Sequence, residues 1–197
     1  FPVTGTVGIS SETIVTINAD TNSVDAFGRQ RVSEPFTLGD YKHIYSIDTN
    51  FIDSTANGGS VIFSGNTATA TLSTNNSISS TAKHQTKFYH NYQPGKSQSI
   101  LSSINFGYAQ QNVTKRTGYY DDRDGIYFEQ VGSNTSNGTD NGTLNFVIRS
   151  FTTGTASESA VGSYKRRVPQ SEWNVDTCDG TGPSGFNIDT SKTQLIA

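Results

Sequence analysis

Short runs in which every second residue is apolar recur along the chain, and this alternation restricts the fold more than any other feature. It is clearest at residues 13–17 (TIVTI), 60–63 (SVIF) and 67–74 (TATATLST). A period of two places the apolar side chains on one face of a β-strand. Further runs are rich in β-branched and aromatic residues, and Gly, Asn, Asp and Ser separate them. These additional strand candidates are residues 85–92, 100–108, 112–120, 125–131 and 144–151.

The many short strands, with no long helical pattern between them, predict an all-β protein. The expected architecture is an antiparallel β-sandwich or jelly-roll-like domain. Residues 132–143 are rich in Gly, Asn and Ser and are expected to form a polar loop. One helical turn is expected at residues 170–176, with Ser171 as its N-cap.

The first 24 residues differ from the rest, because their Thr-rich runs VTGTVGIS and TIVTIN contain no large aromatic residue. We expect an extended N-terminal β arm or linker at residues 1–24, whose exposed strand edges would pair with a neighbouring chain. The sandwich domain is then expected at residues 25–197. The sequence contains no methionine and stops within the periodic run QLIA. We therefore expect this domain to be truncated and to continue beyond Ala197.

The charge and cysteine content disfavour several classes of protein. With 14 basic and 17 acidic residues, the formal net charge is −3, which provides no general attraction for nucleic acid. No window approaches the roughly 20 apolar residues that a membrane-spanning helix needs, so membrane insertion is not expected. The single cysteine, Cys178, allows neither an intrachain disulfide nor a thiolate metal site. It is expected to be a small buried or half-buried residue.

Two motifs imitate known binding loops. The triplet Gly95-Lys96-Ser97 ends like a phosphate-binding loop, but His90 stands where the first glycine of that loop is required. The residues after the triplet alternate like a strand, so a structural turn is favoured. The segment 121–125 (DDRDG) begins like a calcium loop, yet that alignment would place Tyr120 and Val131 at ligand positions. A β-hairpin turn that ends in Asp-Gly is the better interpretation.

The remaining reactive residues form no catalytic signature. His43, His84 and His90 have neither metal-ligand spacing nor a carboxylate partner that can be identified in the sequence, so they are interpreted as surface or core residues. No Gly-x-Ser-x-Gly motif occurs. Two carboxyl groups about 5–10 Å apart in an open cleft would be needed to indicate a glycosidase. The sequence thus predicts neither an enzyme nor a cofactor or metal site.

Four aromatic residues, Tyr119, Tyr120, Tyr127 and Trp173, are candidates for a platform on which a sugar ring could stack. Packing in the core or between neighbouring strands is the more common role of aromatic residues in β proteins. A carbohydrate-binding or receptor-binding β-sandwich module, with a glycan of the host surface as partner, is therefore kept as the alternative function.

Four longer blocks of sequence carry a family resemblance: residues 25–43 (DAFGRQRVSEPFTLGDYKH), 92–107, 115–130 and 168–194. In this order they resemble a family of large virion-associated structural proteins of tailed phages, especially marine ones. The resemblance implies a non-enzymatic, capsid- or tail-associated component of a virion, and it transfers no catalytic residue. The partners would be other copies of the chain and other virion proteins, because symmetric particles consist of repeated copies.

Arg29 and Arg31 follow the expected arm and could anchor the domain to carboxylates of a neighbouring molecule. An ordinary pair of surface arginines is the alternative interpretation.

Overall fold

The computed structural model describes residues 37–91, 98–133, 135–151 and 163–196. Its contacts divide the chain into two compact units, Phe1–Gln93 and Pro94–Ala197. The sequence predicted one domain from residue 25 onwards and gave no sign of a division between Gln93 and Pro94. The expected arm at residues 1–24, its boundary with the domain, and the turn at 95–97 lie outside the described residues.

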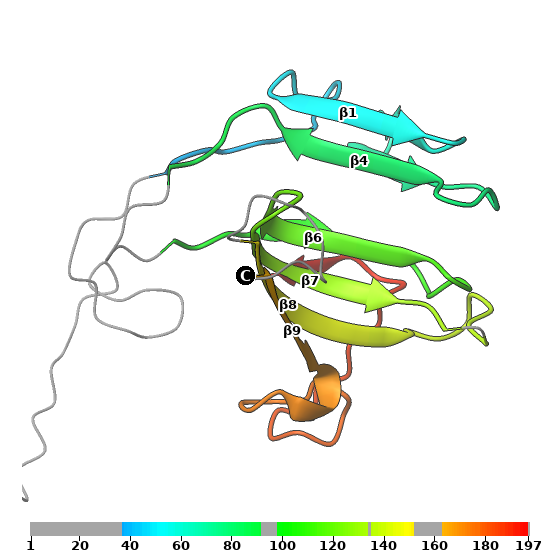
Figure 1. The fold of residues 1–197 in the computed structure, drawn as a ribbon, viewed down its shortest axis with the longest axis vertical. Helices are drawn as coiled ribbons and strands as arrows, with labels where there is room; N and C mark the ends of the chain where they lie inside the picture. Colours follow the sequence, from blue (N-terminus) through cyan, green and yellow to red (C-terminus); the bar gives the residue numbers. More distant parts are fainter. Residues whose placement is uncertain (1–36, 92–97, 134, 152–162, 197) are drawn as a thin grey trace, which may run out of the picture. The chain divides into compact units, whose positions relative to one another are not determined.

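The described residues of the first unit form two antiparallel strand pairs (Figure 1). Strand β1 (Phe51–Ala56) pairs with β4 (Thr81–Thr86), and β2 (Ser60–Ser64) pairs with β3 (Thr69–Ser73). The register of the first pair places Asp53 opposite His84. None of the described residues 37–91 is buried, so the described part of this unit has no closed apolar core.

The second unit is built on a four-stranded antiparallel sheet with the strand order β6-β7-β8-β9 (Figure 1). Short strands β5 (Ser102–Ile104) and β10 (Gln194–Ile196) form a separate pair, so the end of the chain returns to the beginning of the unit. The strands of the sheet are Thr114–Tyr120, Gly125–Val131, Thr143–Phe151 and Ser163–Pro169.

The buried apolar side chains among the described residues all belong to the second unit. Tyr127 and Phe128 are neighbours on β7 and are both buried, and neighbouring residues of a strand face opposite sides. Both faces of the sheet are therefore covered at its centre. On the side of Phe128, Phe106 and Trp173 pack at ring-centroid distances of 5.6 and 6.0 Å. The other buried apolar residues are Ala109, Leu144, Val147 and Phe151.

The predicted all-β antiparallel class is confirmed, and the sandwich or jelly-roll arrangement stays a prediction. The candidate 125–131 coincides with β7, and 121–125 closes the β6–β7 hairpin through the amide of Asp121, which donates to the carbonyl of Asp124 at 2.9 Å. The strand predicted at 85–92 is wrong beyond Thr86, where β4 ends. The candidate at 13–17 lies outside the described residues.

The predicted helical turn is present as a 3₁₀ helix at Gln170–Glu172. Its N-cap is Pro169 and not Ser171, and no side chain caps it. The predicted loop at 132–143 corresponds, in its described residues, to the connection between β7 and β8. Within the described residues, no helix has the length and hydropathy needed to cross a membrane.

Candidate functional site

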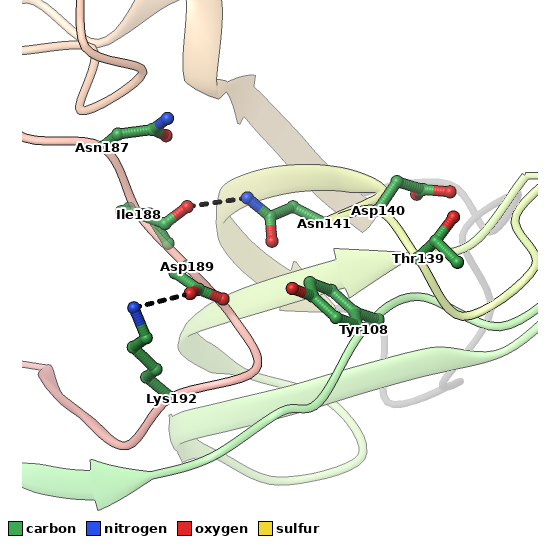
Figure 2. A pocket seen from close by; sticks show the side chains of 8 residues that line it. All are labelled: Tyr108, Thr139, Asp140, Asn141, Asn187, Ile188, Asp189 and Lys192. Carbon is green, nitrogen blue, oxygen red and sulfur yellow. Dashed lines mark hydrogen bonds and ion pairs between the residues drawn. The ribbon is translucent and has the colours of Figure 1, made fainter.

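An open pocket of about 400 Å³ lies in the second unit, between the β7–β8 connection and the segment that precedes β10. Figure 2 shows the ring of Tyr108 between these two segments. Polar side chains dominate the lining, and Ile188 is its aliphatic member. The lining residues are Tyr108, Thr139, Asp140, Asn141, Asn187, Ile188, Asp189 and Lys192.

Asn141 ties the two walls of the pocket together. Its Nδ2 donates to the carbonyl of Ile188 at 2.7 Å, and its Oδ1 accepts from the amide and the hydroxyl of Thr190 at 3.1 and 2.8 Å. A side chain with all these bonds satisfied has one orientation. The amide of Asn141 is thus a structural clamp, and it holds the two walls at a fixed separation.

Gln130 on β7 connects the same segments from within the unit, and its side chain is fully buried. Its Nε2 donates to the carbonyl oxygens of Gly107 and Asn141 at 3.0 and 3.1 Å, and to the hydroxyl of Thr190 at 3.2 Å. These acceptors adjoin Tyr108, the 139–141 loop and the 187–192 segment. The central sheet therefore positions all three parts of the pocket.

The carboxylate of Asp189 is held in its ionised form. Its Oδ1 accepts from the hydroxyl and the amide of Ser191 at 2.5 and 3.0 Å, and its Oδ2 lies 3.1 Å from Nζ of Lys192. The hydrogen bond from Ser191, followed by that from Lys192, lowers the pKa of Asp189 below its ordinary value. A carboxyl group in this setting suits binding better than proton donation, which needs a raised pKa.

Asp140 and Tyr108 are fixed by different contacts. Oδ1 of Asp140 accepts from the amide of Gly142 at 2.7 Å and from the hydroxyl of Ser136 at 3.3 Å. The carbonyl of Tyr108 accepts from Nζ of Lys115 at 2.9 Å, while the tyrosine itself is 38% exposed. Burial lowers the pKa of Lys115. Its ammonium group contacts the backbone of Tyr108 and does not line the pocket.

The four aromatic residues proposed from the sequence do not form one platform. Tyr127 is buried, and Arg116 and Arg149 stack against its ring at 5.4 and 5.5 Å. Trp173 packs on Phe146 at 4.9 Å and donates its Nε1 hydrogen to the carbonyl of Val168. Tyr119 and Tyr120 are neighbours on β6 and face opposite sides of the sheet. The aromatic residue exposed in the pocket is Tyr108, which this prediction missed.

Two clusters of charged residues have no signal in the sequence, because their members are far apart in the chain. On the second unit, Glu129 is fully buried and accepts from Nε of Arg116 at 2.8 Å and from Nε of Arg167 at 2.7 Å. On the first unit, Nδ1 of His84 lies 2.6 Å from Asp53, and its Nε2 lies 3.1 Å from Nε2 of His43.

The partner of His84 corrects the sequence interpretation, which found no carboxylate for any histidine. His90 also lies away from the strand of His84, because β4 ends at Thr86, and its Nε2 is 3.2 Å from the hydroxyl of Tyr41. Among the described residues, no group of three or more His, Cys, Asp or Glu side chains could hold a metal ion. The histidine pair is therefore a hydrogen-bonded contact within the first unit.

Two other sequence predictions concern Cys178 and the pair Arg29 and Arg31. Cys178 is half-buried, as predicted, and desolvation followed by the charge of Asp176 raises the pKa of its thiol. Arg29 and Arg31 lie outside the described residues. Comparison with known proteins finds no match among family models, curated proteins or solved structures.

Proposed function

We propose that this chain is a non-enzymatic structural component of a tailed-phage virion, and that it assembles with other copies of itself through contacts of its β-rich first unit. The observation that carries the proposal is the combination of ordered strands with large apolar side chains at the surface. Ile62 on β2 is 63% exposed, and Ile78, between β3 and β4, is 94% exposed. The four sequence blocks that resemble virion proteins support the particle assignment.

The strands of the first unit bury too little to be stable by themselves. Two-stranded sheets are marginal in water, and ordering the backbone costs about 1–2 kcal/mol per residue. Full burial of one isoleucine side chain contributes about 1.5–3 kcal/mol. Since none of the described residues 37–91 is buried, contacts between copies would supply this stabilisation. Large apolar residues exposed here are Leu38, Ile44, Tyr45, Ile52, Ile62, Leu72, Ile78, Phe88 and Tyr89.

Purified virus particles provide the direct test of the particle assignment. Quantitative mass spectrometry would compare the abundance of this chain with that of the major coat protein. Similar abundance would make the chain a shell or decoration component, and a small fraction would indicate the tail or its fibres. Complete absence from the particles would refute the virion assignment.

Sedimentation velocity tests the assembly mechanism on the isolated chain. The variants Ile62→Asn and Ile78→Asn should each reduce the fraction of oligomer, because a polar amide would have to be buried at the contact. Val175→Asn is the matched control, since Val175 is an exposed aliphatic residue of the second unit. A parent chain that stays monomeric at micromolar concentrations would contradict the proposal, as would equal effects of all three substitutions.

A second candidate function, carbohydrate binding, is favoured by a different observation. The pocket around Tyr108 combines an exposed aromatic ring with amide and carboxylate groups. The two candidates are compatible, because a virion component can also carry a receptor-binding site.

A further inference from the structure

We propose that the pocket around Tyr108 binds a neutral sugar unit, such as the terminal residue of a glycan. The occupant would lie against Tyr108 and hydrogen-bond to Asp140 and Asn187. This proposal does not depend on the virion role, because the pocket belongs to the second unit, whereas the assembly argument rests on the first. The two can therefore fail separately.

The size and lining of the pocket fit a small polar ligand. A volume of about 400 Å³ lies at the lower end of the roughly 300–1,000 Å³ of ordinary ligand sites. Such sites are mostly apolar, whereas this one has a single aliphatic residue, Ile188. A compact ligand rich in hydroxyl groups matches the polar lining, and an apolar ligand would leave polar groups without partners.

The charges that line the pocket disfavour an acidic ligand. The lining carries two carboxylates, Asp140 and Asp189, against one ammonium group, Lys192. Lys192 and Asp189 are already paired at 3.1 Å, which leaves Asp140 as the uncompensated charge. A phosphate or carboxylate would be repelled by Asp140, a cost that a neutral ligand avoids.

The polar groups of the lining that the protein does not already hydrogen-bond are of the types that bind hydroxyl groups. Among the described residues, Oδ2 of Asp140, the side-chain amide of Asn187 and the hydroxyl of Tyr108 have no hydrogen-bond partner. A carboxylate oxygen accepts, an amide both donates and accepts, and each sugar hydroxyl can do both. The exposed ring of Tyr108 offers the apolar face of a sugar a surface to pack on.

The pocket is also preorganised for binding. Asn141 holds the two walls together, and Gln130 fixes the segments below them. A rigid site has little conformational entropy to lose on binding. Both carboxylates already accept hydrogen bonds from the protein, and Asp189 has a lowered pKa. We therefore expect binding without cleavage of a glycosidic bond.

The test is a titration of the full chain with single sugars, followed in ¹H–¹⁵N NMR spectra. The neutral probes are glucose, galactose, mannose and N-acetylglucosamine, each to roughly 50 mM, since single sugars with few contacts bind in the millimolar range. At least one should give saturable shift changes. N-Acetylneuraminic acid provides the acidic comparison, and it should bind more weakly than the best neutral sugar.

Two substitutions connect the binding to the pocket. Asn187→Ala removes an amide that has no partner within the described residues, and Tyr108→Ala removes the exposed ring. Each should weaken binding roughly threefold to tenfold, which is the usual contribution of one lost polar or packing contact. Asn174→Ala and Tyr164→Ala are the matched controls, because both residues are exposed and neither lines the pocket. The spectra themselves report whether each variant is folded.

Several results would overturn the proposal. Absence of saturable shifts with all four neutral sugars is one, and equal binding by the parent, Asn187→Ala and Tyr108→Ala chains is another. Binding of N-acetylneuraminic acid as tight as that of the best neutral sugar would refute the charge argument. Cleavage of lactose by the chain would show that the pocket is catalytic, which contradicts binding without turnover.

Discussion

At the scale of single residues, Glu129 is, among the described residues, the charged side chain most completely removed from water. Burial by itself would raise its pKa, but hydrogen bonds from Arg167 and Arg116 outweigh burial and lower the pKa below the ordinary value of 4.5. Its carboxylate oxygens each accept one arginine Nε, at 2.7 and 2.8 Å. The carboxylate thus links β7 with β6 and with β9, a strand that is not its neighbour in the sheet.

The substitution Glu129→Gln should destabilise the second unit by about 3 kcal/mol, because it removes a buried carboxylate that accepts hydrogen bonds from two guanidinium groups. Urea unfolding can be followed through Trp173, which is the single tryptophan of the chain and packs on Phe128 and Phe146. Glu172→Gln, an exposed carboxylate, is the control and should change stability by less than about 0.5 kcal/mol. Equal midpoints for the two variants would contradict a stabilising role of Glu129.

The pH dependence of Glu129 follows from the direction of its shift. A carboxyl group whose folded-state pKa is lowered stabilises the protein above its unfolded-state pKa, and this stabilisation is lost as the pH falls through the folded-state value. The difference in the free energy of unfolding between the parent chain and Glu129→Gln should therefore have its full value at pH 7. It should shrink as the pH falls below the ordinary value of 4.5.

His43 should make the first unit sensitive to mild acid. Burial, followed by the nearby charge of His84, lowers the pKa of His43 below 6.5, while the carboxylates of Asp48 and Asp53 oppose the shift. The unfolded chain then takes up a proton at a higher pH than the folded chain. The contribution of His43 to the stability of the first unit is therefore complete above about pH 6.5. It decreases as the pH falls through 6.5 towards the folded-state pKa.

An NMR titration of the histidine ring protons measures this directly. His43 should titrate below 6.5 in the parent chain, and His84→Gln should move its pKa upward, because one neighbouring positive charge is removed. His90→Gln is the control, since His90 contacts Tyr41 and not His43. A pKa of His43 that is the same in the parent and in His84→Gln would exclude coupling between the two rings.

At the scale of elements, the β6–β7 hairpin depends on a glycine at its tight turn. Gly125 has φ +138°, and a Cβ there would come within 2.3 Å of Cα of Tyr120 and 2.4 Å of the carbonyl of Tyr119. The backbone of β6 therefore leaves no room for a side chain at the beginning of β7. This is the structural reason for the Asp-Gly pair that predicted the hairpin.

The substitution Gly125→Ala should destabilise the second unit by roughly 2–4 kcal/mol, since it adds a steric clash to an unfavourable backbone conformation. Gly185→Ala separates the two effects. Gly185 also has a positive φ, of +64°, but no atom would lie within 4 Å of its Cβ. Gly185→Ala should lower the free energy of unfolding by only about 1 kcal/mol in the same urea experiment. Similar losses in the two variants would mean that crowding at Gly125 is unimportant.

The strands that the sequence predicted and those that it missed differ in where their polar residues find partners. Strands β2 and β3 were found from apolar alternation, and β7 and β8 from their β-branched and aromatic residues. Strand β1 was missed because Asp53 interrupts its apolar pattern, yet Asp53 faces His84 across the strand pair. Strand β9 contains three consecutive basic residues, of which Arg167 reaches the buried Glu129. Partners 31 and 38 residues away leave no trace in a local pattern.

At the scale of the whole molecule, the two units differ in how much they bury. The sheet of the second unit buries side chains on both faces at its centre, although Ile126 and Ile148 remain 59% and 48% exposed, whereas no described residue of the first unit is buried. If the exposed apolar residues of the first unit form contacts between copies, the hydrophobic effect and not charge drives association.

Self-association of the chain should therefore persist at roughly 1 M NaCl, where screening acts within about 3 Å. It should weaken on cooling, because hydrophobic stabilisation decreases at low temperature. Sedimentation velocity at low and high salt, and at two temperatures, distinguishes the two driving forces. Dissociation by salt would indicate contacts between charged groups and contradict the apolar assembly.

The candidate site was less predictable than the fold. The sequence directed attention to Tyr119, Tyr120, Tyr127 and Trp173, because they are prominent aromatic residues. The structure does not join these four residues on one surface, because Tyr120 packs on Tyr127 at 4.7 Å whereas Tyr119 faces the other side of the sheet. It instead brings Tyr108 together with two loops that begin about 30 and 80 residues later. The clamp formed by Asn141 spans 47 residues. No local spacing could have indicated this group.

The sequence by itself determined the all-β class, most strands of the main sheet and the Asp-Gly hairpin. These features follow from local chemistry: side-chain alternation, β-branching and the conformational freedom of glycine. The tertiary structure decided the division into two units, the pairing of Glu129 and His84, and the pocket around Tyr108. Each of these depends on which distant segments pair and in what register, because burial and hydrogen bonding act through space and not along the chain.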